Sequence, residues 1–267
     1  MKINHLDLFS GIGGFALGLS MADAKTFNTL AFCECEVYCQ KLLKQNFNQK
    51  PIFDAVEKIS EKDIKDEIDL ITAGFPCQDL SIAGNKKGLK GEKSGLFYEV
   101  IRIAKFTKAK FILFENSSEL IWRDDFREEF IKRIQAIGYD CWWQILCAKS
   151  FGYAHKRKRA YVICWNKEYF FTNSFSIGCF LYEKFHHFYA NEITPKPSKE
   201  IVSLYSEYRK RRCEKDYILD CEDIRRDDGF SSAMDAVNGL GNAVIPLIVK
   251  IYGLAIREIF RKEKNEF

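Results

Sequence analysis

The chain has 267 residues, and its 41 Lys and Arg against 37 Asp and Glu give a formal net charge of +4. A hydrophobic content of 47% excludes a mainly disordered protein, and 16 Gly with 5 Pro exclude a collagen-like repeat. The length predicts one or two domains. We expect no membrane association, because no apolar run approaches the ~18 residues that a membrane helix needs. A secretory signal is not expected either, since Asp7 and a glycine cluster interrupt the first apolar stretch.

Short apolar runs alternate with helical patterns over the first 165 residues. The runs that predict strands are residues 3–9, 29–32, 68–73, 111–114 and 161–165. The helical patterns begin at Phe15, continue to about Phe47 after the second run, and recur at 95–105 and 125–137. Strands that alternate with helices in this way are typical of an α/β fold with a mostly parallel, doubly wound sheet.

The pattern changes after about residue 166. Residues 169–189 contain nine Phe or Tyr without an evident helical period, and two prolines in 194–198 indicate a break. The charged stretch 199–215 and the strongly apolar stretch 245–260 both have helical character. We therefore expect a main domain at 1–166, a small insert at 167–225, and a C-terminal segment at 226–267 that returns to the main domain.

Ten cysteines are present, but none forms a C-x-x-C pair. Cys33, Cys35 and Cys39 lie close together without an evident fourth ligand, so we expect no metal site. Most of the thiols are expected to be reduced and to pack as small hydrophobic side chains. Cys77 differs, because it follows the expected strand 68–73 in the sequence GFPCQDLS, where a side chain lies over the ligand-binding edge of such a sheet.

A glycine-rich loop separates the first expected strand from the first helix. The sequence GIGGFA at 11–16 fits the pattern G-x-G-x-x-A, and Glu34 follows about 20 residues further on. Glycines let the backbone approach a ligand, and an acid at that distance can accept hydrogen bonds from two ribose hydroxyls. The pattern suits NAD, FAD or S-adenosylmethionine, and a purely structural glycine turn remains an alternative.

Two candidate catalytic groups follow expected strands. A nucleophilic thiolate at Cys77 would need a positive environment, which Lys86 and Lys87 could supply. Glu115 ends the run 111–114, where apolar surroundings would raise its pKa and suit it to donate a proton. The structural alternatives are a buried cysteine and a glutamate that begins a loop.

Cations gather in three places, at 84–93, 149–159 and 209–212. Each cluster could be a solvated surface, and together they favour a phosphate-backbone partner only modestly.

Five motifs in order resemble those of the DNA cytosine carbon-5 methyltransferases, over about 1–166 and 226–260. They are DLFSGIGG at 7–14, GFPCQDLS at 74–81, ENS at 115–117, HKRKR at 155–159 and GNAV at 241–244. Ser117 stands where the family usually has Val, His155 stands where it has Gln, and the insert is short. The resemblance implies a Rossmann-like S-adenosylmethionine-dependent methyltransferase fold with a target-recognition insert, and it removes the NAD alternative.

The resemblance also assigns catalytic roles. It implies that Cys77 adds to carbon 6 of cytosine, which activates carbon 5 toward the methyl group of S-adenosylmethionine. Glu115 would contact ring nitrogen 3 and the exocyclic amine, and Arg159 would orient it with Arg157 alongside. Asn116 would be structural or would orient the base.

The cofactor and DNA residues are implied in the same way. The cofactor would contact Phe9, Gly11, Gly13, Glu34, Cys35, Asp54, Pro76, Leu96, Asn242 and Val244. Cys35 replaces an aromatic residue that often stacks on adenine. DNA would contact Gln78, Ser81, Lys86, Lys87, Arg209 and Arg211.

The implied partner is double-stranded DNA with the target cytosine flipped out of the helix. A cognate restriction endonuclease is a candidate second partner, and we expect a cytoplasmic monomer. The alternatives are an RNA cytosine methyltransferase and a DNA-binding relative with weak or no catalysis. The presence of Cys77, Glu115 and Arg159 together argues against the second alternative.

Overall fold

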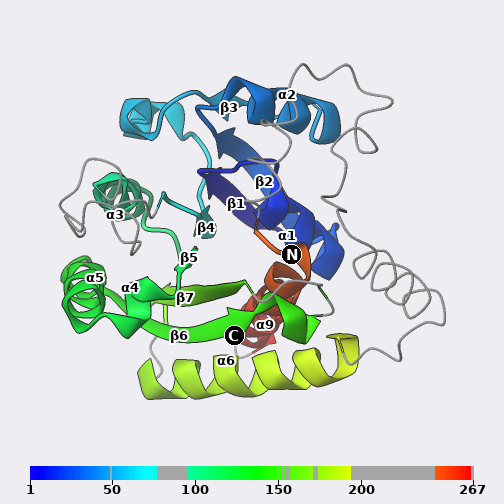
Figure 1. Cartoon of the computed structure of the whole chain (residues 1–267), viewed down its shortest axis with the longest axis vertical. Coiled ribbons are helices and arrows are strands. Elements are labelled where there is room, and N and C mark those ends of the chain that lie inside the picture. The colour runs from blue at the N-terminus through cyan, green and yellow to red at the C-terminus, as the bar shows by residue number, and fades with distance from the viewer. Residues whose placement is uncertain are drawn as a thin grey trace, which may run out of the picture.

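The computed structural model describes residues 1–48, 50–76, 95–151, 153, 157–170, 174–193 and 244–265. Helices cover both faces of one seven-stranded sheet with the order β3-β2-β1-β4-β5-β7-β6 (Figure 1). The strands are β1 (Ile3–Leu8), β2 (Phe27–Cys33), β3 (Ile52–Phe53), β4 (Leu70–Ala73), β5 (Phe111–Ser117), β6 (Tyr139–Cys147) and β7 (Lys158–Asn166). The pairings among the first five are parallel, whereas β7 is antiparallel to both β5 and β6. The predicted mostly parallel, doubly wound sheet is confirmed.

The helices divide between the two faces. They are α1 (Gly14–Asp23), α2 (Val37–Asn46), α3 (Leu96–Thr107), α4 (Glu119–Trp122), α5 (Asp124–Ala136), α6 (Ser174–Phe188) and α9 (Pro246–Asn265). The core against α3 and α5 contains Ile112 and Phe114 of β5, and the core against α1, α6 and α9 contains Phe111 and Leu113 of the same strand. Because successive strand residues face opposite sides, a strand buried on both faces is a continuous apolar run.

Two elements lack the sequence signals that identified the others. The side chains of β6 after Tyr139 are only half-buried at the edge of the sheet, so the strand shows neither an apolar run nor a clear alternation. In α6, Ile177, Leu181 and Phe185 form a buried stripe with helical spacing, and the other aromatic residues of 169–189 obscure it. Phe170 and Phe185 belong to the main core, and Tyr169, Phe180, Phe188 and Tyr189 pack against it.

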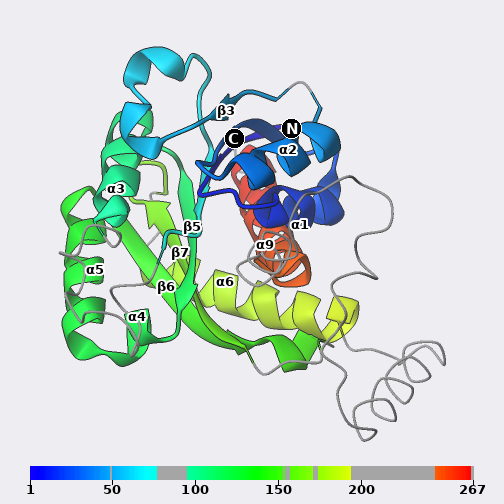
Figure 2. The same ribbon diagram turned by 45° about the horizontal axis from the view of Figure 1, so that its top comes forward.

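The C-terminal helix α9 packs closely against α1, as Figures 1 and 2 both show. Gly18 permits this contact, because a Cβ at this position would lie 2.5 Å from both the Pro246 carbonyl oxygen and the Val249 Cβ. A second glycine, Gly253, fits against Ala22 in the same way. The contact buries the apolar face of α9 and holds α1 in place.

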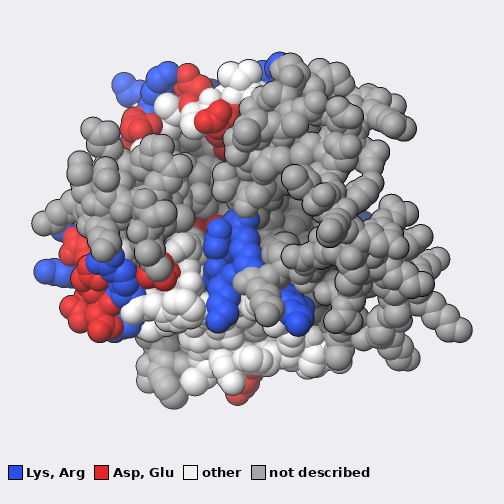
Figure 3. Space-filling view, viewed as in Figure 1, with Lys and Arg blue, Asp and Glu red and all other residues white. Residues whose placement is uncertain are grey.

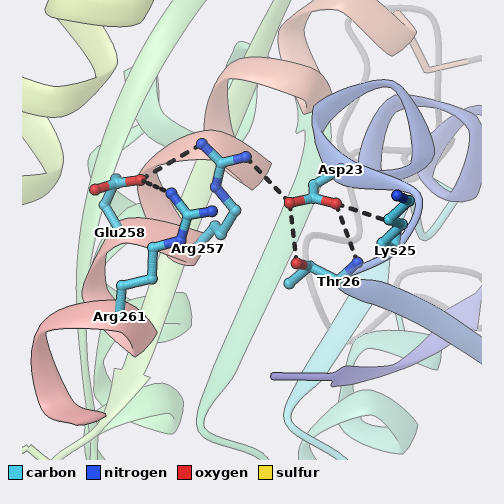
Figure 4. Close-up of polar contacts among 6 residues, drawn as sticks. All are labelled: Asp23, Lys25, Thr26, Arg257, Glu258 and Arg261. Carbon is cyan, nitrogen blue, oxygen red and sulfur yellow. Dashed lines mark hydrogen bonds and ion pairs between the residues drawn. The ribbon is translucent and has the colours of Figure 1, made fainter. Parts of the chain in front are cut away.

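Polar contacts hold the other end of the same helix pair (Figure 4). Arg257 Nη1 of α9 lies 3.2 Å from Asp23 Oδ2, and Asp23 also accepts hydrogen bonds from the Thr26 backbone and hydroxyl at 3.1 and 3.0 Å. Burial raises the pKa of Asp23, but the hydrogen bonds from Thr26 and Arg257 outweigh it and hold this pKa below its usual range. The carboxylate thus joins the end of α1, the turn before β2, and α9.

The predicted insert at 167–225 is described only at 167–170 and 174–193, and the expected helix at 199–215 lies outside the described residues. Within the described part, no helix combines the length and the apolar character needed to cross a membrane.

Candidate active site

The loop between β1 and α1 has the tight geometry that its glycines allow. Gly11 and Gly13 have φ of +54° and +89°, and Phe9 has φ of +55°, a conformation that side chains disfavour. The N-cap residue of α1 is Gly13, which has no side chain to cap the first turn, and the start of the helix carries the positive end of the helix dipole. A Cβ on Gly11 would meet no atom within 4 Å, so there is room for a ligand against this backbone.

Glu34 joins this loop to the end of β2. Its Oε2 accepts a hydrogen bond from the Gly11 backbone N–H at 2.7 Å, and its Oε1 accepts one from the Glu36 N–H at 2.8 Å. The residue is 8% exposed, and each carboxylate oxygen keeps a further lone pair for a hydroxyl. The fixed carboxylate fits the ribose hydroxyls of S-adenosylmethionine, and the open glycine loop fits its methionine end.

Two more of the expected cofactor residues lie near Glu34. Cys35 follows it and is exposed. Asp54 comes directly after Phe53, whose carbonyl accepts a hydrogen bond from the Glu34 N–H at 2.9 Å. The Asp54 carboxylate is 65% exposed and pairs with Lys58 at 2.7 Å. Such an exposed pair is weak, so it leaves the carboxylate accessible to a ligand amine.

A buried polar chain lies beneath the glycine loop. His5 Nε2 contacts Thr72 Oγ1 at 2.7 Å, and the Thr72 hydroxyl donates to Asp7 Oδ1 at 2.7 Å. Burial raises the pKa of Asp7 to about 8 and lowers the pKa of His5 to about 3. Both groups are therefore neutral at pH 7, and the chain fixes β1 against β4 without a buried charge.

Glu115 occupies the opposite side of the site. The strand β5 continues to Ser117, so Glu115 lies within the strand and its side chain has a fixed direction. Its Oε1 is 3.2 Å from Arg159 Nε and 3.6 Å from Arg157 Nη2, yet this oxygen has no hydrogen bond within the described structure. Burial raises the pKa of Glu115, and the two guanidinium groups oppose the rise only in part. The surroundings therefore favour either a protonated Glu115 carboxyl group or a ligand that forms a hydrogen bond with Oε1.

Asn116 connects this strand to the predicted nucleophile segment. Its Nδ2 donates a hydrogen bond to the Phe75 carbonyl at 3.1 Å, immediately before Pro76. Eight of the expected site residues lie outside the described residues, namely Cys77, Gln78, Ser81, Lys86, Lys87, Arg209, Arg211 and Asn242. Asn116 nevertheless holds the chain that leads to Cys77 beside the strand that carries Glu115.

Gly74 lies where the two sides of the site meet. A Cβ at Gly74 would lie 3.7 Å from Glu115 Oε2, 3.7 Å from Phe15 Cε2 and 3.8 Å from Val244 Cγ2. Val244 also reaches the start of α1, because its carbonyl oxygen would lie 2.7 Å from a Cβ on Gly14. The structure thus brings Val244 to the glycine loop. Leu96, another expected cofactor residue, begins α3 and packs partly buried against the core.

Sequence reasoning missed one residue of this region. Tyr161 is buried and is the cross-strand partner of Glu115 in the β5–β7 ladder. The signal was available, because Arg159 and Tyr161 alternate along β7 and so face the same side. Among the described residues, no group of His, Cys, Asp or Glu is arranged to bind a metal ion.

Comparisons with known proteins agree with this arrangement. The sequence profile of the C-5 cytosine-specific DNA methylase family matches residues 3–256. The type II methyltransferase M.CviJI of Paramecium bursaria Chlorella virus IL3A is 36% identical over 169 residues, which are 63% of this chain and 45% of the relative. The type II methyltransferase M.HhaI of Haemophilus parahaemolyticus is 33% identical over 184 residues, or 68% of this chain and 53% of the relative. The chain thus spans about half the length of these relatives.

Solved structures share the fold at lower identity. The S. pombe Dnmt2 methyltransferase matches 62% of this chain and 51% of its own, with a TM-score of 0.52 and 21% identity. A Spodoptera frugiperda DNMT2 mutant gives the same TM-score and identity over 62% of this chain and 50% of its own. At this identity the likeness establishes the fold.

Proposed function

Because the chain belongs to the C-5 cytosine-specific DNA methylase family, we propose that it transfers a methyl group from S-adenosylmethionine to carbon 5 of cytosine in duplex DNA. One observation carries the proposal. Glu115 is buried with an unbonded carboxyl oxygen between two guanidinium groups, next to the chain that leads to Cys77. A cytosine edge is a partner that such a carboxyl group can bind.

Bound S-adenosylmethionine supplies an electrophilic methyl group. Glu34 holds its ribose hydroxyls through the lone pairs that the Gly11 and Glu36 amides leave free. The backbone from Phe9 to Gly13 lines its methionine end, where the start of α1 favours the carboxylate. In the proposal, this pocket is completed by Cys35, Asp54, Pro76, Leu96, Asn242 and Val244.

Cys77 is the proposed nucleophile. Its thiolate would add to carbon 6 of the flipped base, and the electron pair that moves through the ring would let carbon 5 take the methyl group as its bond to sulfur breaks and S-adenosylhomocysteine leaves. Loss of the carbon-5 proton to a base then expels the thiolate and restores the ring. Because Glu115 stays protonated to a higher pH than an ordinary carboxyl group, it can hydrogen-bond ring nitrogen 3 as charge develops there.

The remaining contacts concern DNA. In this proposal, Gln78, Ser81, Lys86 and Lys87 hold the opened duplex, and Arg209 and Arg211 contact phosphates from a recognition segment within 167–225. The two relatives named above are type II methyltransferases. A role in protecting DNA from a cognate endonuclease is therefore the proposed context.

The test is transfer of a labelled methyl group to DNA and, separately, to RNA. We expect transfer to duplex DNA, a covalent adduct with DNA that carries 5-fluorocytosine, and loss of both in Cys77→Ala with cofactor binding retained. Bisulfite sequencing of DNA from cells that express the protein would locate the target. Transfer by Cys77→Ala at the wild-type rate, or transfer to RNA alone, would contradict the proposal.

A further inference from the structure

An exposed tryptophan lies on the helix that follows the Glu115 strand. Trp122 ends α4, five residues after Ser117, and it is 54% exposed. Large aromatic side chains are usually buried, since leaving one in water forfeits a favourable transfer free energy. The short helix α4 buries Leu120 and Ile121 in the core and leaves the indole of Trp122 at the surface. Core packing therefore does not explain the tryptophan.

A lysine from the site accompanies it. Lys158 Nζ lies 5.4 Å from the centre of the Trp122 ring, within the range of a cation–π contact. Lys158 begins β7 between the two arginines that reach Glu115, but strand alternation directs it to the other face. Among the described residues, no carboxylate lies within 4 Å of the Lys158 ammonium group. Its contact there is with the face of the Trp122 ring.

Positive charge surrounds this position. Figure 3 shows Lys and Arg side chains gathered near the centre of one face, over the region of β6 and β7 in Figure 1. In this part of the chain Lys149 and Lys158 are exposed, and Arg157 and Arg159 are half-buried. An ammonium group that has no carboxylate partner among the described residues, beside an apolar ring, suits a ligand that carries both a phosphate and a flat or apolar sugar-base surface.

We propose that Trp122 and Lys158 form a contact for the DNA backbone at the mouth of the active site. In this contact the Lys158 ammonium pairs with a phosphate near the flipped cytosine, and the Trp122 indole packs on the adjoining nucleotide. The inference rests on the proposed function and extends it to Trp122, which lies outside the five family motifs, and to Lys158, a position of the 155–159 motif without an assigned role.

The two side chains have different expected signatures. A phosphate contact releases counterions, so Lys158→Gln lowers the slope of log affinity against log salt by about 0.9, and Lys158→Arg restores it. An apolar contact releases none, so Trp122→Ala weakens binding about fivefold or more at every salt concentration without a change in slope. Trp122→Phe, which keeps a smaller ring, lies between Trp122→Ala and the wild type.

The measurement is fluorescence anisotropy with a labelled mixed-sequence DNA duplex and S-adenosylhomocysteine, across a salt series. The matched controls are Tyr182→Ala, a 52% exposed ring on α6, and Lys25→Gln, an exposed cation at the other edge of the sheet; both should bind as the wild type does. The proposal would be overturned if Trp122→Ala and Lys158→Gln both kept the wild-type affinity and salt slope. It would also be overturned if the control variants lost as much affinity as the test variants. If Trp122→Ala does not fold, the Lys158→Gln slope decides alone.

This experiment separates the two proposals. A wild type that binds DNA but transfers no methyl group would contradict the proposed function, while the salt slopes would still test the contact. A wild type that methylates DNA with no effect from either substitution would contradict the contact alone.

Discussion

The two halves of the site are built in different ways. The half around Glu34 is held by backbone N–H groups, a glycine turn and the packing of α9 beneath α1. The half around Glu115 is held by charged side chains, and it contains an unbonded buried oxygen. The contacts of Glu34 lie within the fold itself, whereas Glu115 Oε1 has no hydrogen bond among the described residues, as is also true of Asp7 Oδ2 beneath the glycine loop. Substitutions should therefore affect stability mainly in the first half and reaction rate mainly in the second.

The largest expected effect is that of Glu115→Gln on the rate. We expect methyl transfer to fall by about 100-fold or more, because the group that stabilises the activated ring is lost. Stability should change little, since Gln keeps the size of the side chain and burial already disfavours the charged carboxylate despite its ion pairs with Arg157 and Arg159. Because the pKa of Glu115 is raised, the wild-type rate should also decline as pH rises through that pKa, and the variant should lack this decline. Single-turnover kinetics across pH measure both.

The control is Glu168→Gln, which removes a 70% exposed carboxylate just after β7. It should leave the rate and its pH profile unchanged. A Glu115→Gln variant that unfolds far below the wild-type temperature would show that the carboxyl group is structural, contrary to the comparison.

The next largest effect is expected in the support beneath the glycine loop. Gly18→Ala should cost about 1–3 kcal/mol of unfolding free energy, because its Cβ would overlap the Pro246 carbonyl and Val249. Gly178→Ala on α6 is the matched control. A Cβ on Gly178 would lie 3.6 Å from Trp165 Cη2, an ordinary contact, so helix propensity should make this change neutral or stabilising. Equal stability of the two variants in urea unfolding would contradict the close packing of α1 on α9.

A smaller effect should follow from loss of the Glu34 carboxylate. Glu34→Ala should weaken S-adenosylmethionine binding by about 1–3 kcal/mol, the cost of charged hydrogen bonds left unmade. Glu36→Ala removes an exposed neighbouring carboxylate and should bind as the wild type does. Calorimetry with the cofactor measures the difference in affinity. An unchanged affinity in Glu34→Ala would contradict the assignment of Glu34 to the ribose.

The smallest effect should come from the pair in Figure 4. Asp23→Asn should cost about 0.5–1.5 kcal/mol, because hydrogen bonds from Thr26 and Arg257 weaken. Since the pKa of Asp23 is lowered on folding, its contribution is present above the ordinary aspartate pKa and is lost as pH falls below it. Thermal unfolding of wild type and variant should therefore converge at acid pH. Stability curves that remain parallel down to that pH would contradict the assignment.

The sequence predicted the parts of the fold that are buried on both faces. The runs at 68–73 and 111–114 became β4 and β5, and the stretch 245–260 became most of α9. The edge strand β6 and the helix α6 were not predicted, because half-buried positions and crowded aromatic residues blur the periods of 2 and 3.6 residues.

The candidate site was predictable only where a motif carries it. The glycine loop, Glu34 and Glu115 were found from short patterns, and the structure places the two arginines against Glu115. The place of Gly74 became visible only with the structure, because its neighbours are distant along the chain, and Tyr161 was missed although it alternates with Arg159 along β7. The pairing of Trp122 with Lys158 is of the same kind.

The seam between α1 and α9 also has a consequence for synthesis. On the ribosome, Gly18 emerges more than 200 residues before Val249, the side chain that fills the space beside it. A nascent chain therefore carries its glycine loop through the synthesis of more than 200 further residues without the helix that supports it, and the apolar surface of α1 stays exposed until α9 emerges. Newly made chains should accordingly gain cofactor affinity and protease resistance together, and only after α9 has left the ribosomal tunnel.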